Sequence, residues 1–408
     1  MNTRAVAARV LLRITDEGAF SNVLLPHATA DLSQLDRGFV YRLVTDALRN
    51  VRGVDLIVEQ VAERPIAGLD AEVRSVLRIA VAEMVTGSEA DSHAHATVNE
   101  SVEAVKQLGS ARAASFVNAV LRRLSRSGIP AVDDSPAVSL SVPDWLFDVV
   151  GADHGEDGAR ELLEGLREAG PATPVRVRPG FQPPRRARPV PGITGAFAID
   201  GAVNPGPGIS LSDAASTAVG LALGPHSGEL VLDMAAAPGG KTLHLWDLAG
   251  GEVRLIALDR HRRRLRNARR RLSAASATPT WIYGDGARAP FADGAFDAVL
   301  LDAPCTGLGT LRRRPEIAMR LTAGSPKRLA AQQSAMLAEA WRLTRPGGRI
   351  VYSVCTVFAE ETVDVVEGYP AAAPEGLPGR RWGRGLLLTP HLTGTDGMFI
   401  SRIERTPG

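Results

Sequence analysis

The feature that most constrains this fold is an alternation of short apolar runs and amphipathic segments over residues 230–354. The apolar runs have the length of buried strands, and the segments between them have the period of helices, about 3.6 residues. Such an alternation predicts a doubly wound α/β fold with a parallel sheet. The predicted strands are Leu230 to Met234, Val253 to Leu258, Thr280 to Tyr283, Phe296 to Leu301 and Arg349 to Val354, and the predicted helices include His261 to Leu272 and Lys327 to Thr344.

The stretch Leu301 to Thr310, which reads Leu-Asp-Ala-Pro-Cys-Thr-Gly-Leu-Gly-Thr, begins where the fourth predicted strand ends. It places Asp302 and Cys305 at the carboxyl end of that strand, and Cys355 follows the fifth. Ligands of open α/β sheets bind outside these strand ends. A lone cysteine is most often a small buried hydrophobe. Here both cysteines of the chain fall at strand ends, which predicts a site for two reactants.

A Gly-rich turn, within Asp233 to Thr242, follows the first predicted strand. A nucleotide phosphate loop needs glycine five residues before Gly240, where this chain has Ala235, and the dinucleotide pattern of glycines is also missing. An adenosyl-type cofactor loop remains. Asp259, which closes the second strand, supports it, because a carboxylate there can bind both ribose hydroxyls. Asp285, just past the third strand, is predicted to contact the adenine side.

Every periodic segment from Thr3 to about Arg126 is helical, which predicts an all-α domain of six or seven short helices over residues 1–130. Breakers at Ser127 to Pro130 end this domain. Residues 131–209 are predicted to be a linker and small connecting subdomain, with two helices and a Pro- and Arg-rich tract. Residues 210–408 are the predicted catalytic domain. Its first helix is expected to run to Leu223, with Ser212 as the cap.

The charge of the chain is unevenly distributed. Residues 206–408 hold 25 basic and 19 acidic side chains, although the whole chain has a net charge of only +2. This surplus favours a polyanionic substrate. The arginine run Arg260 to Arg271 has two interpretations, a solvated helix face, which is favoured, or a contact with an RNA backbone. Arg312, Arg313 and Arg314 follow the Cys305 loop and are better placed for phosphates.

Composition excludes several classes of protein. The chain has no apolar run of the roughly 18 residues that span a bilayer, and its N-terminus lacks a signal-peptide pattern, so a cytoplasmic protein without a membrane partner is expected. Two distant cysteines and eight scattered histidines make neither a disulfide framework nor a zinc spacing. No metal and no DNA partner are expected, and a monomer is favoured.

Two thiols and a carboxylate suit methylation at carbon 5 of a pyrimidine. That carbon is too weak a nucleophile to attack a sulfonium methyl group unaided. A thiolate that adds at carbon 6 activates carbon 5, and a carboxylate near ring nitrogen 3 stabilises the intermediate. A second thiol or a water can then remove the carbon-5 proton. This chemistry alone leaves open which cysteine attacks.

The chain resembles the Fmu/Sun (RsmB-like) family of RNA cytosine-5 methyltransferases. The resemblance rests on Asp233 to Thr242, Leu301 to Arg314, Val351 to Thr356 followed by Glu360 and Glu361, and the tail Gly394 to Phe399. The helical segments around Leu77, Val98 and Phe116 resemble the NusB-like RNA-binding domain that RsmB-type members carry. The resemblance implies an all-α NusB-like domain, a Rossmann-like methyltransferase domain, S-adenosyl-L-methionine as cofactor and small-subunit (16S) ribosomal RNA as substrate.

The resemblance also implies roles for individual residues. Cys355 is the implied nucleophile, Cys305 the thiol that assists resolution, and Asp302 lies between cofactor and base. The implied cofactor-binding residues are Ala235, Ala236, Ala237, Pro238, Gly239, Gly240, Lys241, Asp259, Asp285 and Asp302. This chain has alanine at Ala235 and Ala236, where the family often has a cysteine, and valine at Val354, where threonine is usual. Neither departure removes a group that the mechanism requires.

Two other readings remain. An amino-directed methyltransferase uses an Asp/Asn-Pro-Pro-aromatic loop, whereas this chain has Asp302, Ala303, Pro304 and Cys305 there. A NusB-like RNA-binding or ribosome assembly factor with a catalytically silent methyltransferase domain is the alternative from another class. Intact Cys305, Cys355 and Asp302 favour an active enzyme.

Overall fold

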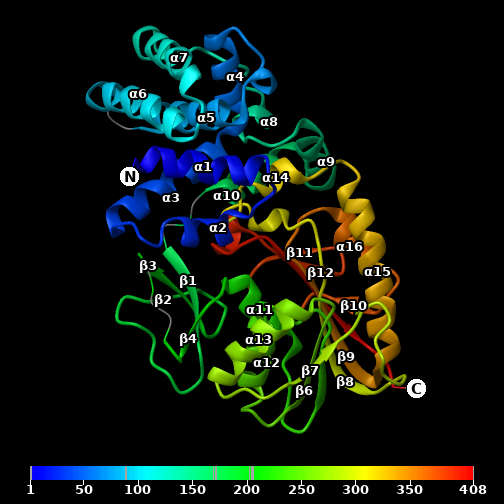
Figure 1. Ribbon diagram of the computed structural model, residues 1–408. Helices are drawn as coiled ribbons and strands as arrows, with labels where there is room; N and C mark the ends of the chain where they lie inside the picture. Colours follow the sequence, from blue (N-terminus) through cyan, green and yellow to red (C-terminus); the bar gives the residue numbers. More distant parts are fainter. Residues whose placement is uncertain are drawn as a thin grey trace. The chain divides into compact units, whose positions relative to one another are not determined.

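The computed structural model describes residues 2–87, 90–168, 170, 172–201, 203 and 206–407, with only the backbone for residues 90–94 (Figure 1). The chain forms two compact units. One comprises residues 1–151 and 313–320, and the other comprises residues 152–312 and 321–408. The three-part division at residues 130 and 209 stays a prediction about domain organisation.

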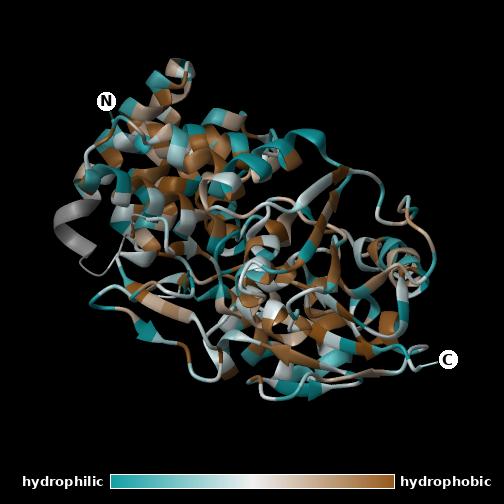
Figure 2. Ribbon diagram, turned by 90° about the horizontal axis from the view of Figure 1, so that it is seen from below, coloured by the Kyte–Doolittle hydropathy of each residue, from teal (hydrophilic) through white to brown (hydrophobic). Residues whose placement is uncertain are grey.

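The N-terminal unit is built from helices, as the sequence predicts. They are α1 (Thr3–Thr15), α2 (Ser21–Ala28), α3 (Gln34–Arg49), α4 (Val51–Ala62), α5 (Ala71–Thr86), α6 (Ala90–Gln107), α7 (Ala114–Ser127), α8 (Pro136–Ser139), the start of α9 (Asp144–His154) and α14 (Ile317–Arg320), with 3-10 turns at Ile66–Gly68 and Ala111–Ala113. Hydrophobic and hydrophilic residues alternate along these helices (Figure 2). This pattern gives each longer helix one apolar face for the core.

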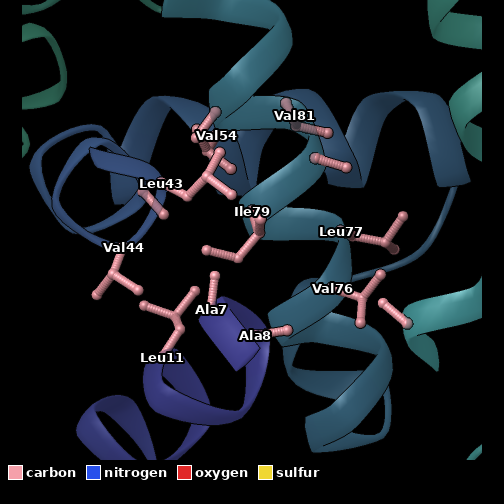
Figure 3. Packing of buried hydrophobic residues seen from close by; sticks show 14 of the residues in the cluster. Ala7, Ala8, Leu11, Leu43, Val44, Val54, Val76, Leu77, Ile79 and Val81 are labelled. Carbon is pink, nitrogen blue, oxygen red and sulfur yellow. The ribbon is translucent and has the colours of Figure 1, made fainter. Parts of the chain in front are cut away.

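The core of this unit forms around α1 and α5. Ala7 of α1 points toward Ile79 of α5, Leu11 of α1 lies beside Val44 of α3, and all four side chains are buried (Figure 3). Small side chains such as Ala7 let two helix backbones approach closely. At the edge of this core, Arg4 forms an ion pair with Glu83, with 2.7 Å between Nη2 and Oε1. Burial of the apolar face of each longer helix in one core therefore accounts for the all-α unit.

A short segment from much later in the chain, residues 313–320, also belongs to the N-terminal unit. Glu316 within it is almost fully buried and accepts hydrogen bonds from the backbone N–H and the hydroxyl group of Ser21, both at 3.0 Å. The guanidinium group of Arg320 lies 4.4 Å from the centre of the Phe20 ring. The start of α2 thus holds both ends of α14.

The second unit contains a small antiparallel sheet and a large mixed sheet. The small sheet has strands β1 (Ala172–Val177), β2 (Arg188–Pro189), β3 (Ala196–Asp200) and β4 (Ile209–Leu211), in the order β2-β3-β1-β4. The helices are the end of α9, α10 (Glu156–Arg167), α11 (Ala214–Leu223), α12 (Gly240–Leu248), α13 (Arg262–Ala274), α15 (Ser325–Leu343), α16 (Val363–Val366) and α17 (Pro390–Thr393), with 3-10 turns at Leu308–Thr310 and Ala359–Glu361. Buried Arg176 of β1 and half-buried Arg178, which directly follows that strand, both bind Asp247 of α12, each with a 2.8 Å contact.

The large sheet contains all five predicted parallel strands. Its strands are β5 (Leu230–Asp233), β6 (Arg254–Asp259), β7 (Thr280–Tyr283), β8 (Phe296–Asp302), β9 (Thr344–Val354), β10 (Ala371–Ala372), β11 (Arg380–Trp382), β12 (Gly385–Leu388) and β13 (Met398–Glu404). The order is β11-β12-β13-β9-β8-β5-β6-β7, with β10 paired to β13. Strands β5 to β9 are parallel, whereas β10 to β13 join antiparallel. The antiparallel extension was not part of the prediction.

The two faces of the large sheet are covered by different helices. Ala298 and Leu300 of β8 belong to the hydrophobic cluster that includes α11, while Val299 and Leu301 alternate with them and point to the other face. All four side chains are buried. The strand order changes direction between β5 and β8, and such a switch point is where open α/β sheets bind ligands.

One sequence prediction is wrong in detail. Helix α11 is capped by Asp213 and not by Ser212. The Asp213 carboxylate accepts the backbone N–H of Ala215 at 2.9 Å, and it also accepts the N–H of Asp396 at 3.0 Å. A carboxylate that binds two amides is a stronger cap than the neighbouring hydroxyl group, and the second amide lies too far along the chain to be foreseen. No helix in the described residues is long and apolar enough to span a membrane.

Candidate active site

The Gly-rich turn lies between β5 and α12, beside the switch point. Gly239, the last residue before α12, has a φ of 91°, a left-handed conformation that favours glycine. The Asp233 carboxylate at the end of β5 accepts the Thr242 hydroxyl group at 2.6 Å, which ties the strand to the first turn of the helix. Burial raises the pKa of Asp233 to about 7. The turn presents a helix N-terminus, which favours a negatively charged group.

Asp259 lies at the end of β6, next to this turn. Its Oδ2 atom accepts the backbone N–H of Ala237 at 3.0 Å, and its Oδ1 atom accepts that of His261 at 2.7 Å. The carboxylate is buried and is held in place from both sides. Each oxygen has a second lone pair, so the group can still accept a pair of ligand hydroxyls.

Asp285 lies just past β7, at the same edge of the sheet. It is exposed, and its carboxylate accepts the N–H of Ala287 within its own turn at 3.0 Å. Strands β5, β6 and β7 are parallel neighbours. The three acidic residues Asp233, Asp259 and Asp285 therefore follow three adjacent strands, although Asp285 has no hydrogen bond to the Gly-rich turn among the described residues.

Two arginines of α13 hold the turn from outside. Arg264 donates to the carbonyl oxygen of Ala237 at 2.8 Å, and Arg271 donates to that of Pro238. The sequence reasoning assigned this arginine run to solvent or to an RNA backbone and missed this use. Only the fold reveals it, because the two side chains lie on the flank of α13 that faces the turn.

A lysine in the first turn of α12 and a carboxylate at the end of β8 form an ion pair. Lys241 Nζ lies 2.8 Å from Asp302 Oδ2, and the Ser353 hydroxyl group donates to Asp302 Oδ1 at 2.9 Å. Burial alone would lower the pKa of Lys241, but the Asp302 carboxylate outweighs it and raises that pKa above its ordinary value. The pair is therefore charged and oriented at neutral pH.

The two cysteines lie side by side, as their positions on adjacent strands predict. Their Sγ atoms are 3.3 Å apart, and both residues are half-buried. The hydrogen bond to Cys355, together with burial, raises the pKa of the Cys305 thiol well above its ordinary value. Cys355 is also within electrostatic range of the Lys241 ammonium group. The two sulfur atoms are therefore not equivalent, since the neighbouring sulfur and burial disfavour a thiolate on Cys305, while the Lys241 ammonium group favours negative charge on Cys355.

Glu361 is a central residue of the site that the sequence reasoning did not single out. It is fully buried, and its carboxylate accepts the backbone N–H of Thr306 at 2.9 Å, the Thr306 hydroxyl group and the side-chain amide of Gln333 at 2.9 Å. The Thr356 hydroxyl group lies 3.3 Å from the same carboxylate. Burial raises the pKa of Glu361 despite these donors. In sequence only its place in the Glu360 and Glu361 pair marked it.

The backbone also joins the two cysteine loops. Gly309 donates its N–H to the carbonyl oxygen of Cys355 at 3.0 Å, and Gly397 donates to the carbonyl oxygen of Gly309 at 2.8 Å. A Cβ atom on Gly309 would lie 2.1 Å from the oxygen of Gly397, so this approach requires glycine. The tail segment Gly394 to Phe399 thus supports the site through the hydrogen bond from Gly397 to Gly309.

These features define the chain as an α/β methyltransferase of the S-adenosylmethionine-dependent fold class with an N-terminal helical unit. The family model for the 16S rRNA methyltransferase RsmB/F matches residues 220–404, and that for the NusB family matches residues 1–126. The chain belongs to the RsmB family of ribosomal RNA small subunit methyltransferases.

Curated relatives match over almost the whole chain. The chain is 32% identical to ribosomal RNA small subunit methyltransferase B of Xanthomonas campestris, over 98% of this chain and 96% of that protein. It is 33% identical to the protein of the same name from Thermus thermophilus, over 98% and 97%. The crystal structure of PH0851 superposes with a TM-score of 0.86 at 20% identity, over 99% of each chain, which shows that the fold is shared.

Proposed function

We propose that this enzyme methylates carbon 5 of a cytosine in small-subunit ribosomal RNA, with S-adenosyl-L-methionine as methyl donor and Cys355 as the nucleophile. The observation that carries the proposal is the pair of thiols 3.3 Å apart beside the Lys241 and Asp302 ion pair. Membership of the RsmB family supports an RNA substrate. A cytoplasmic location, where ribosomal RNA is found, stays a prediction.

The residues around the Gly-rich turn fit the proposed cofactor. The N-terminus of α12 suits its carboxylate, and the buried Asp259 carboxylate suits the ribose hydroxyls. A Cβ atom on Gly240 would meet no atom within 4 Å, so the backbone is open to a ligand there. Ala235 to Lys241, Asp259, Asp285 and Asp302 are the proposed binding residues. When bound, the cofactor supplies an electrophilic methyl group.

The protein's own groups would act on the base as follows. The Cys355 thiolate, favoured by the Lys241 ammonium group, forms a bond from Sγ to carbon 6, which makes carbon 5 nucleophilic. The Asp302 carboxylate, oriented by Lys241 and Ser353, accepts from the exocyclic amine of the base. The Cys305 thiol first gives its proton to solvent water. After methylation the resulting thiolate takes the carbon-5 proton, the electron pair of that C–H bond forms the double bond between carbons 5 and 6, and the bond between Sγ and carbon 6 breaks to return Cys355 as a thiolate.

The test is transfer of labelled methyl groups from S-adenosylmethionine to small-subunit ribosomal RNA taken from cells that lack this protein, followed by nucleoside analysis. The proposal requires 5-methylcytidine with the wild-type enzyme and none with Cys355→Ala, while that variant still binds the cofactor. Product with Cys355→Ala would refute the assigned nucleophile. Cofactor binding without any 5-methylcytidine, on free RNA or on assembling subunits, would favour another RNA substrate or the assembly-factor alternative.

A further inference from the structure

Helix α13 carries a concentration of positive charge that the chain itself does not balance. Residues 260–271 include eight arginines and no acidic residue. Arg262, Arg263, Arg266, Arg269 and Arg270, here called the α13 arginine face, are exposed, and none forms an ion pair within the described residues. Several of them are three or four positions apart, and like charges at that spacing destabilise a helix. This surface is therefore suited to a negatively charged partner from outside the chain.

The arginine face lies next to the candidate active site. Arg264 and Arg271, on the flank of the same helix, donate to the carbonyl oxygens of Ala237 and Pro238 in the Gly-rich turn. Helix α13 starts three residues after Asp259, at the carboxyl ends of the strands. Its 13 residues extend about 20 Å, which covers several successive phosphates of a nucleic-acid strand.

An exposed aromatic ring lies beside the same face. Tyr283 ends β7 with 53% of its surface exposed, and the Arg262 guanidinium group is 4.4 Å from the centre of its ring. Proteins that bind single-stranded nucleic acids combine a basic surface with aromatic rings on which unpaired bases stack. A ring and a row of cationic side chains on one surface together suit a ligand that offers both bases and phosphates.

We propose that the α13 arginine face binds the phosphate backbone of the RNA substrate, and that Tyr283 stacks on an unpaired base next to the methylation target. The identity of the polyanion as RNA rests on the proposed function. The surface delivers the substrate strand to the edge of the sheet where the two cysteines lie. Arg264 and Arg271 are not part of it, because they hold the Gly-rich turn.

The experiment compares two variants of the full-length enzyme. Arg263→Gln, Arg266→Gln and Arg270→Gln are combined in the first, because these positions point furthest from the buried residues Leu265, Ala268 and Leu272. Glutamine keeps the helix propensity. Arg160→Gln, Arg254→Gln and Arg328→Gln, also exposed, form a control with the same change of net charge on other elements. The readout is the affinity for transcribed small-subunit RNA between 50 and about 200 mM salt.

The α13 variant should lose about two from the slope of log affinity against log salt, since each phosphate contact to single-stranded RNA contributes about 0.7. Its KM for RNA should rise about tenfold at unchanged cofactor affinity, while the control stays within about twofold of wild type. Equal slopes for both variants would overturn the proposal. So would a loss of binding to vesicles of anionic lipid with no loss of binding to RNA.

Tyr283 is tested separately with a single-stranded oligoribonucleotide. Tyr283→Phe keeps the ring and should bind like wild type, whereas Tyr283→Ala should bind about tenfold more weakly. Equal binding by both would remove Tyr283 from the surface. The two proposals can fail separately. If the proposed function is wrong, the wild-type enzyme forms no 5-methylcytidine, but the salt dependence of RNA affinity still shows whether α13 binds RNA.

Discussion

The hydroxyl oxygens of Thr306 and Thr356 lie 2.7 Å apart, and each threonine directly follows one of the two cysteines. Both hydroxyl groups also reach the buried Glu361 carboxylate. The 3.3 Å separation of the two Sγ atoms is therefore set by a hydrogen-bonded layer directly beneath them. An error of an ångström in that layer would move one thiol away from the other.

Glu361→Gln should separate the two cysteine loops. The glutamine oxygen can still accept from the N–H of Thr306 and the amide of Gln333, but its NH₂ group would replace the oxygen that now accepts from the Thr306 and Thr356 hydroxyls, and the negative charge that strengthens all of these hydrogen bonds would be lost. We expect a loss of about 1–3 kcal/mol in the free energy of unfolding and a fall of roughly tenfold in kcat with little change in the KM for cofactor. Glu360→Gln is the matched control, since Glu360 is exposed. Equal kcat values for the two variants would contradict the positioning role.

Cys305→Ala should trap a covalent complex of enzyme and RNA. If Cys305 takes the carbon-5 proton, its removal leaves the bond between Cys355 and carbon 6 intact after methylation. A complex stable to denaturing electrophoresis should accumulate, with turnover reduced at least about a hundredfold. The double variant Cys305→Ala and Cys355→Ala should give no complex. Normal turnover by Cys305→Ala would show that a water performs the step.

Asp259→Ala should weaken cofactor binding by about 1–3 kcal/mol, the scale of hydrogen bonds to a charged group. The substitution removes the predicted ribose acceptor and also frees the N–H of Ala237 in the Gly-rich turn. Calorimetry with S-adenosylmethionine measures the change. Asp364→Ala, at an exposed position, serves as the control. An unchanged Kd for Asp259→Ala would refute the ribose role.

Asp233 should make stability depend on pH. Burial raises its pKa from 3.8 to about 7, so the folded state holds the proton more tightly than the unfolded state. Its contribution is therefore fully present below about pH 4 and is lost as the pH rises towards about 7. The loss amounts to at most about 4 kcal/mol. The free energy of unfolding in urea should fall between these pH values for wild type but not for Asp233→Asn. If it changed equally with pH in both proteins, a group other than Asp233 would be responsible.

Local patterns explain what the sequence predicted. The period of the apolar residues depends on neighbours in the chain, so strands β5 to β9 and the N-terminal helices were predictable. The rule that ligands bind at strand ends then placed Cys305 and Cys355 together before any contact was known. Those predictions needed only the order of elements along the chain.

Contacts between distant segments explain what was missed. Glu360 and Glu361 are the same residue type in adjacent positions, and only the packing of α15 and β9 buries one and exposes the other. Asp213 outcompeted Ser212 as the cap of α11 because Asp396, far along the chain, supplies a second amide. Arg264 and Arg271 could not be separated from the other arginines of α13 before the Gly-rich turn was placed against them.

The return of residues 313–320 to the N-terminal unit makes that unit indivisible from the rest of the polypeptide. A protein truncated after residue 151 would lack Glu316 and Arg320, and the start of α2 would lose the partners of Ser21 and Phe20. Conversely, a protein beginning at residue 152 would leave residues 313–320 without the partners of Glu316 and Arg320. Deletion or exchange of residues 1–151 alone would therefore break contacts within the N-terminal unit that residues 313–320 supply.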